Sequence, residues 1–159
     1  MPRVSVLVGA STRQYRRVVQ PPRVRKAFAY ITRGDRLLVF HHRDVPLGEA
    51  GVQVPAGTIR DDEPPADAAM REAVEETGLK ELALLRYLGS AEYDVRPGRN
   101  EIHERHFFHF RAPEDTPDEW VWHEMHDGMQ PPTAFCFWWT PLTKAHVLAA
   151  GMGALIGRL

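Results

Sequence analysis

Carboxylate side chains crowd one short stretch of the 159-residue chain, "GTIRDDEPPADAAMREAVEETGL", from Gly57 to Leu79. Seven of these residues are Asp or Glu, and only two arginines oppose them. Glu72, Glu75 and Glu76 lie three and four residues apart, so on a helix they would be neighbours. Like charges at this spacing destabilise a helix by a few tenths of a kcal/mol per pair, so stability alone does not account for them.

The chemistry that suits such a cluster is the binding of a divalent cation. Hard ions such as Mg²⁺ prefer oxygen ligands and bind a few carboxylates together with the phosphates of a substrate. An ion held in this way neutralises a polyphosphate, activates a water molecule and stabilises the leaving oxygen. The alternative is a solvated acidic helix face, which is common. The residues around the glutamates decide between the two readings.

These surrounding residues follow a strict pattern, G-x5-E-x7-R-E-U-x-E-E-x-G-U, in which U is apolar. With roughly one chance in fifteen for each fixed residue type, the seven fixed positions coincide about once in 10⁸ windows. The pattern resembles the signature, or box, of the Nudix hydrolases. The preceding "QVPAGTI" is similar to the strand and loop that lead into that box.

The resemblance implies a metal-dependent hydrolase with Mg²⁺ or Mn²⁺ as cofactor. Its partner would be a small molecule, a nucleoside diphosphate linked to another moiety, whose pyrophosphate linkage is cleaved. The implied fold is α/β, an α/β/α sandwich with a mixed β-sheet, in which the box forms a loop–helix–loop. We expect this domain over residues 24–159, after a basic leader at residues 1–23.

The resemblance also implies the metal ligands. Glu72, Glu75 and Glu76 are the expected carboxylate ligands, and the backbone carbonyl of Ala56 is an additional one. Glu63 is expected either to anchor the loop or to contact the metal through water.

The remaining box positions are expected to support these ligands. Arg71 would orient a neighbouring glutamate, and Gly57 and Gly78 would supply tight backbone turns.

The general base has two possible origins in this resemblance. A box glutamate, Glu72 or Glu75, is favoured. The alternative is a glutamate that follows the box, and four residues qualify: Glu101, Glu104, Glu119 and Glu124.

Aromatic and imidazole side chains are candidate contacts to the substrate. Trp120 and Trp122 would share one face of a strand and could stack on a base, although core packing is the commoner use of an aromatic ring. Phe28, Tyr30 and His41 are further candidates. Which nucleotide derivative is bound does not follow from the sequence.

Hydrophobic periodicity predicts the elements that position these residues. Gly78 would end the box helix in a left-handed conformation, and Pro64 and Pro65 suit its first turn. Ala66, Met70, Ala73 and Thr77 would form its inner face. Strands are expected at 24–31, 36–42, 52–57, 81–95, 103–112, 119–126 and 134–139, with a turn at 33–35, a loop at 45–51 and a last helix at 142–157.

Composition limits the cellular setting. Residues 1–26 carry seven basic residues and no acid, although the net charge of the whole chain is −1. This leader could attract a phosphate-bearing ligand or could simply be solvated, and no basic stripe follows that would indicate nucleic-acid binding. One cysteine and no signal or membrane-spanning segment favour a cytoplasmic protein. A homodimer and a monomer are equally consistent with the sequence.

Two other readings stay open. One is a non-catalytic module that binds a nucleotide or nucleotide sugar on the same fold, although such relatives commonly lose box glutamates that this chain keeps. The other is an isomerase of a prenyl diphosphate, which would need a catalytic cysteine. Cys136 lies in the apolar run "AFCFWW", where burial is the more natural role.

Overall fold

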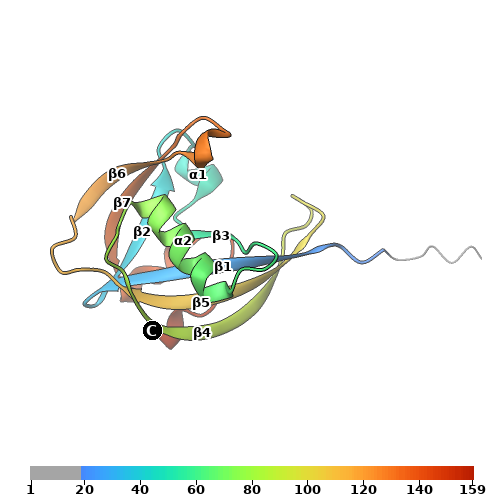
Figure 1. Ribbon diagram of the computed structural model, residues 1–159, viewed down its shortest axis with the longest axis horizontal. Coiled ribbons are helices and arrows are strands. Elements are labelled where there is room, and N and C mark those ends of the chain that lie inside the picture. Colours follow the sequence, from blue (N-terminus) through green and yellow to red (C-terminus); the bar gives the residue numbers. More distant parts are fainter. Residues whose placement is uncertain (1–18) are drawn as a thin grey trace, which may run out of the picture.

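A computed structural model describes residues 19–159, which form one mixed β-sheet with short helices (Figure 1). The strand order is β4-β5-β1-β2-β7-β6, and β3 pairs with β1 beside this path. Only β1 and β5 run parallel among the pairs of this sheet in the described residues. The strands are β1 (Arg23–Arg33), β2 (Arg36–His42), β3 (Ala56–Thr58), β4 (Ala83–Asp94), β5 (Ile102–Arg111), β6 (Glu119–Glu124) and β7 (Thr133–Pro141).

The box helix, α2 (Pro65–Thr77), crosses one face of the sheet (Figure 1). Pro65 occupies its first turn, and Gly78 ends it with a left-handed φ of 76°, as the sequence predicts. Ala68, Ala69 and Ala73 are fully buried against the first core cluster. These small side chains let the helix lie close to the aromatic side chains of the sheet.

The predicted inner face of α2 is only partly right. Ala73 and Thr77 are buried, whereas Ala66 and Met70 are half-buried at its margin.

The opposite face of the sheet is covered by the C-terminal segment. Its second core cluster includes Tyr30, Phe107 and Val39, against which Leu148 and Leu155 pack. The predicted sandwich is therefore confirmed as a mixed sheet between two covering layers, one of which contains no long helix.

The prediction of a helix at 142–157 is wrong. A 3₁₀ helix, η2 (Leu142–Val147), stops at Leu148, whose ψ of 130° is extended. The backbone N–H of Ala149 instead donates to Val52 at 2.8 Å, and Ala150 and Gly151 have φ angles of 50° and 69°. Pairing with Val52 and two left-handed residues are incompatible with a continuing helix. A final 3₁₀ turn, η3 (Ile156–Arg158), ends the chain.

Smaller differences concern the segment ends. The predicted loop at 45–51 contains a short helix, α1 (Leu47–Ala50), and β6 stops at Glu124 because a 3₁₀ turn, η1 (His126–Gly128), follows. The tight turn after Arg33 joins β1 and β2 as predicted. Most of the predicted leader, residues 1–18, lies outside the described part. Within residues 19–159 no helix is long and apolar enough to cross a bilayer.

Candidate active site

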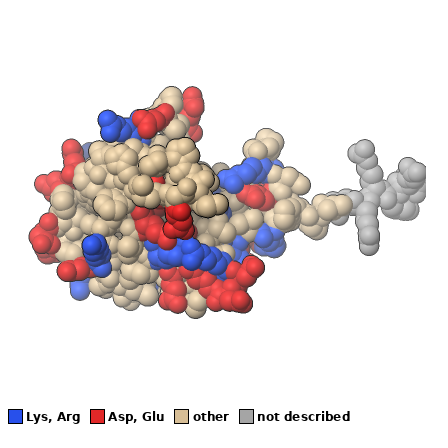
Figure 2. Space-filling model, turned by 45° about the horizontal axis from the view of Figure 1, so that its top comes forward, with Lys and Arg blue, Asp and Glu red and all other residues tan. Residues whose placement is uncertain are grey.

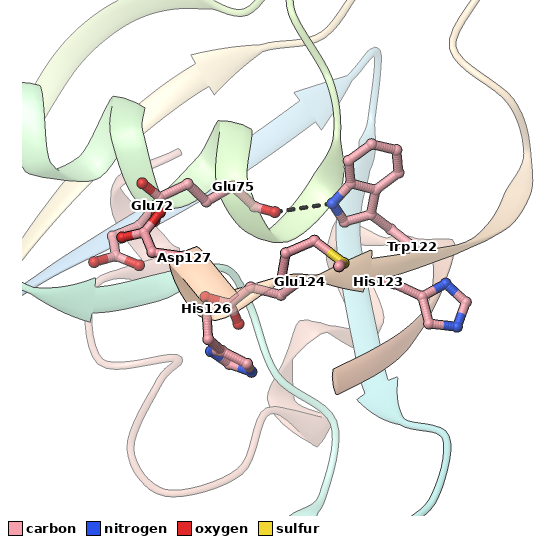
Figure 3. A pocket seen from close by; sticks show the side chains of 8 residues that line it. Glu72, Glu75, Trp122, His123, Glu124, His126 and Asp127 are labelled. Carbon is pink, nitrogen blue, oxygen red and sulfur yellow. Dashed lines mark hydrogen bonds and ion pairs between the residues drawn. The ribbon is translucent and has the colours of Figure 1, made fainter. Parts of the chain in front are cut away.

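Three carboxylates from two elements meet beside the box helix. Glu72 and Glu75 come from α2, and Glu124 comes from the end of β6. One oxygen of each lies within 4.8 Å of the others. They line a cavity of about 380 Å³ together with Trp122 and Asp127. Figure 3 shows Asp127 beside the glutamates, whereas His123 projects away from them.

Two tryptophans fix the strand that carries Glu124. Every second residue of β6 lies on the same face of the strand, and the face turned towards α2 carries Trp120, Trp122 and Glu124. The indole Nε1 of Trp120 donates to the carbonyl of Thr77, and that of Trp122 to the carbonyl of Glu75, each at 2.9 Å. These carbonyls belong to the last turn of the helix, where no intrahelical donor is available. The two bonds hold Glu124 beside the box.

Arg71 organises the carboxylates of the box. Its Nε and Nη2 donate to both oxygens of Glu63 at 2.7 and 2.9 Å, and its Nη1 donates to Glu72 at 2.6 Å. Nη1 also lies 3.5 Å from a Glu75 oxygen. The side-chain hydrogen bond from Arg71 lowers the pKa of Glu63 to about 2. Glu63 also accepts the backbone N–H of Arg60 at 3.0 Å, so it closes the loop before the helix.

Glu76 faces the strand before the box. Its carboxylate accepts the backbone N–H of Ala56 at 3.0 Å, and the residue is 8% exposed. Burial raises the pKa of Glu76 well above its usual value. Burial likewise raises the pKa of Glu72 and of Glu124, although Arg71 opposes the shift at Glu72. Figure 2 shows acidic side chains gathered in the middle of the surface that it presents, next to basic side chains.

The two box glycines serve different purposes. Gly78 has the expected left-handed conformation, but Gly57 lies in β3 and its φ is not positive. The predicted tight turn at Gly57 is therefore wrong. A Cβ on Gly57 would lie 1.8 Å from Cδ of Glu72. Glycine is therefore needed here because the Glu72 carboxylate packs directly against the backbone of residue 57.

The other predicted base residues lie outside the carboxylate cluster. Glu101 contacts His103 at 3.0 Å and Glu104 contacts His106 at 2.8 Å. Glu119 is exposed at the start of β6. Of the four alternatives, the structure brings only Glu124 to Glu72 and Glu75 within residues 19–159.

The predicted substrate contacts are dispersed. Phe28 borders a second cavity, whereas Tyr30 is fully buried with its hydroxyl 2.5 Å from the Met152 carbonyl. Trp120 stacks on the core residue Phe137, and His41 packs near Trp138 on another part of the sheet. Trp122 alone among them lines the cavity of the glutamates.

The second cavity, about 360 Å³, opens on the other side of the box. Ala56, Gly57 and Glu76 form its box end. The basic and aromatic wall of this cavity consists of Lys26, Phe28, Tyr93, Arg99, His103 and Arg105.

Residues 22–155 match the family profile described as the NUDIX domain. The chain belongs to the Nudix family. Family membership makes it a pyrophosphohydrolase, and the cluster of Glu72, Glu75 and Glu124 is consistent with the metal site of a Nudix box. No curated protein matches the chain at a significant level.

Solved Nudix structures share this fold at low sequence identity. The dihydroneopterin triphosphate pyrophosphohydrolase of E. coli has a TM-score of 0.62 and 18% identity, covering 85% of this chain and 96% of that one. A MutT protein from Methanosarcina mazei has a TM-score of 0.59 and 16% identity, covering 88% and 94%. An ADP-ribose pyrophosphatase from Streptococcus suis has a TM-score of 0.56 and 17% identity, covering 85% and 87%. At this identity they show the fold of this Nudix protein and not its substrate.

Sequence reasoning named Phe28, Ala56, Gly57 and Glu76 but missed the basic residues of the second cavity. Arg105 carried a usable signal, because it stands two residues from His103 and two from Phe107 in a predicted strand and therefore shares a face with an apolar residue. A charged residue at an inward position of a strand is unusual and indicates a special environment. Asp127 carried no such signal, since it follows the strand in a turn.

Proposed function

We propose that this Nudix protein hydrolyses the diphosphate linkage of a nucleoside diphosphate derivative with Mg²⁺ or Mn²⁺ bound at Glu72, Glu75 and Glu124. The observation that carries the proposal is the meeting of these three carboxylates within 4.8 Å. Carboxylates this close together repel one another unless cations compensate them, and of the three Arg71 contacts only Glu72 and Glu75. An all-oxygen donor set fits Mg²⁺ or Mn²⁺, and the Ala56 carbonyl and Glu76 at the edge of the second cavity fit as further ligands.

A divalent cation bound there supplies charge neutralisation for the diphosphate and lowers the pKa of water. The chain itself supplies orientation. Arg71 holds Glu72 through a 2.6 Å bond and anchors the loop through Glu63, so the carboxylates are in place before a ligand arrives.

Two residues are candidates for the general base, Glu75 and Glu124. Glu72 is bonded directly to Arg71, which suits a ligand held in one orientation. Glu75 is more exposed than Glu72, and its closest contact with Arg71 is longer, at 3.5 Å. Burial raises the pKa of Glu124, which makes its carboxylate a better proton acceptor.

The test is a panel of nucleoside diphosphate derivatives incubated with Mg²⁺ or Mn²⁺, with phosphate products measured before and after phosphatase treatment. We expect turnover of at least one compound and a loss of about 10²–10⁴ in kcat for Glu124→Gln and Glu75→Gln. Both residues are also proposed ligands, so the base is the one whose substitution lowers kcat by clearly more than it lowers Mn²⁺ affinity. Glu119→Gln, on the same strand as Glu124 and exposed, is the matched control.

Two outcomes would contradict the proposal. Full activity in Glu124→Gln would remove that residue from the site. Ligands that raise thermal stability without being cleaved by the wild-type protein would instead identify a nucleotide-binding module.

The single cysteine, Cys136, remains our reason to propose a cytoplasmic location, and a homodimer stays a proposal.

A further inference from the structure

Arg105 is a buried cation in the middle of β5. Only 4% of its surface is exposed. Its Nη1 donates to the carbonyl of Ala150 at 2.5 Å, whereas its buried Nε has no hydrogen-bond partner among residues 19–159. A buried donor without an acceptor destabilises the fold, and the penalty is larger for a charged group. Within the described part of the chain, this donor is therefore left unsatisfied.

The surroundings of Arg105 are aromatic rather than acidic. Its guanidinium carbon lies 3.8 Å from the ring centroid of Tyr93 and 5.0 Å from that of Phe28. Within the described residues it forms no ion pair with a carboxylate. Burial accordingly lowers the pKa of Arg105. The rings hold the guanidinium plane in one orientation, and they offer no acceptor in that plane.

The cavity beside Arg105 carries an excess of positive charge. Lys26 and Arg99 line it with Arg105. Among the nearby acids, Glu101 already contacts Arg99 at 3.3 Å and His103 at 3.0 Å. The acid at the box end, Glu76, is bonded to a backbone N–H. Within residues 19–159 Arg99 therefore has an acidic partner, whereas Lys26 contacts only the hydroxyl of Thr58 and Arg105 has no carboxylate.

Strand pairing separates Arg105, but not Lys26, from the box. Lys26 of β1 pairs with Thr58 of β3 on one side and with Arg105 of β5 on the other. Two strand spacings place the backbone of Arg105 roughly 10 Å from the backbone of the box strand, since neighbouring strands lie about 4.8 Å apart. Tyr93, on which Arg105 stacks, lies one strand further away, in β4. A diphosphate at the carboxylates would therefore need a second group to reach Arg105.

We propose that the second cavity binds an oxyanion, a phosphate or a carboxylate, on the part of the substrate beyond its diphosphate, and that Arg105 recognises it. This inference rests on the proposed function, because the diphosphate is taken to lie at Glu72, Glu75 and Glu124. The oxyanion accepts the Nε–H of Arg105 and compensates the positive charges of Arg105 and Lys26. Substrates with an uncharged end leave that donor unsatisfied and are turned over less efficiently.

The direct test follows the side-chain Nε–H signal of Arg105 by NMR in the wild-type protein, with EDTA present and inorganic phosphate as the probe. Sodium chloride at matched ionic strength is the control. We expect a saturable shift of the Arg105 signal with phosphate and none with chloride. No shift with phosphate overturns the proposal, whatever the kinetics show. Because EDTA removes metal, this result is independent of the proposed metal site.

Variants then test recognition. Arg105→Gln should weaken phosphate binding about tenfold or more, as expected when a charge-assisted hydrogen bond is lost. Arg111→Gln, at the exposed end of the same strand, makes the same change in charge and should leave binding within about twofold, because exposed charges are screened. Equal weakening in both variants would mean general attraction of anions and would overturn the proposal.

Kinetics with matched substrate pairs connect the cavity to specificity. UDP-glucuronate and UDP-glucose differ by a carboxylate, and NADPH and NADH differ by a phosphate, so the two pairs separate the two kinds of oxyanion. In at least one pair the charged member should have the higher kcat/KM, and Arg105→Gln should reduce the ratio about tenfold. If the role of Arg105 is purely structural, Arg105→Gln lowers kcat/KM by the same factor for both members of a pair. Hydrolysis without any preference for a charged member would overturn recognition of the oxyanion and leave the proposed function standing.

Discussion

The indole Nε1 of Trp122 donates a 2.9 Å hydrogen bond to the backbone carbonyl of Glu75, so a residue of β6 holds the last turn of the box helix (Figure 3). Glu124 lies two residues further along the same strand face. The spacing between the box glutamates and Glu124 therefore depends on this contact. Trp122, which the sequence suggests as a base-stacking residue, has a structural partner that the sequence does not reveal.

Trp122→Phe should lower the free energy of unfolding by about 1 kcal/mol, because one intramolecular hydrogen bond is lost. It should also weaken Mn²⁺ binding, since Glu124 is no longer held beside Glu75. Urea unfolding and Mn²⁺ titration measure the two effects. Trp138→Phe, on β7 and packed in the second core cluster, is the control whose Mn²⁺ affinity should not change. Unchanged Mn²⁺ affinity in Trp122→Phe would show that the indole does not position Glu124.

Gly78→Ala should cost more than its backbone conformation alone predicts. A Cβ there would lie 2.6 Å from the Trp122 ring, in addition to the strain of a φ of 76°. Gly34→Ala is the matched control, because its φ is 58° and nothing lies within 4 Å of the added Cβ. We expect about 1–2 kcal/mol of destabilisation for Gly34→Ala and a larger loss for Gly78→Ala, both measured in urea. Equal destabilisation of the two variants would mean that the Trp122 ring moves aside with no loss of stability.

Gly57→Ala should damage the site more than the fold. The new methyl group would occupy the position of the Glu72 carboxylate, so that side chain must leave the cluster. We expect Mn²⁺ binding and turnover to fall at least about tenfold, as for the loss of a charge-assisted contact. Gly157→Ala, with open space around its Cβ and an ordinary φ, should change neither. Circular dichroism checks that Gly57→Ala stays folded, and normal Mn²⁺ binding in that variant would contradict the prediction.

Tyr30 should make the fold sensitive to alkaline pH. Burial raises its pKa in the folded state to about 12, above the ordinary value of 10.0. A folded pKa above the unfolded one means that the contribution of neutral Tyr30 is complete below pH 10 and is lost as the pH rises to 12. Two units correspond to about 3 kcal/mol as an upper bound.

The Tyr30→Phe variant isolates this group, because other alkaline titrations occur in both proteins. Its free energy of unfolding should be lower near neutral pH, since the Met152 carbonyl loses its donor, and should fall less steeply above pH 10. Urea unfolding at a series of pH values gives both slopes. Identical slopes would show that Tyr30 does not ionise on unfolding.

The box helix could be predicted closely because its signals are local. Proline at its start, a left-handed glycine at its end and the i, i+4 spacing of its glutamates all act within one segment. The C-terminal segment could not be predicted from local signals. Its residues are compatible with a helix, but Ala149 donates a hydrogen bond to Val52, almost a hundred positions earlier in the chain. Glu124 was one of four equivalent candidates in the sequence, and only the packing of β6 on α2 distinguishes it. Arg105 was missed because its environment is assembled from three strands and the C-terminal turn.

The pairing of β3 with β1 beside the main path of the sheet has a consequence for how this protein could diversify. The carboxylate cluster and the second cavity meet at β3 and Glu76, and their other residues come from separate stretches of chain. Exchanging the stretches around Tyr93, Arg99 and Ala150 would alter which compounds enter while sparing the groups that break the bond. A lineage could thus acquire new substrates through these peripheral stretches alone, keeping one hydrolytic centre throughout.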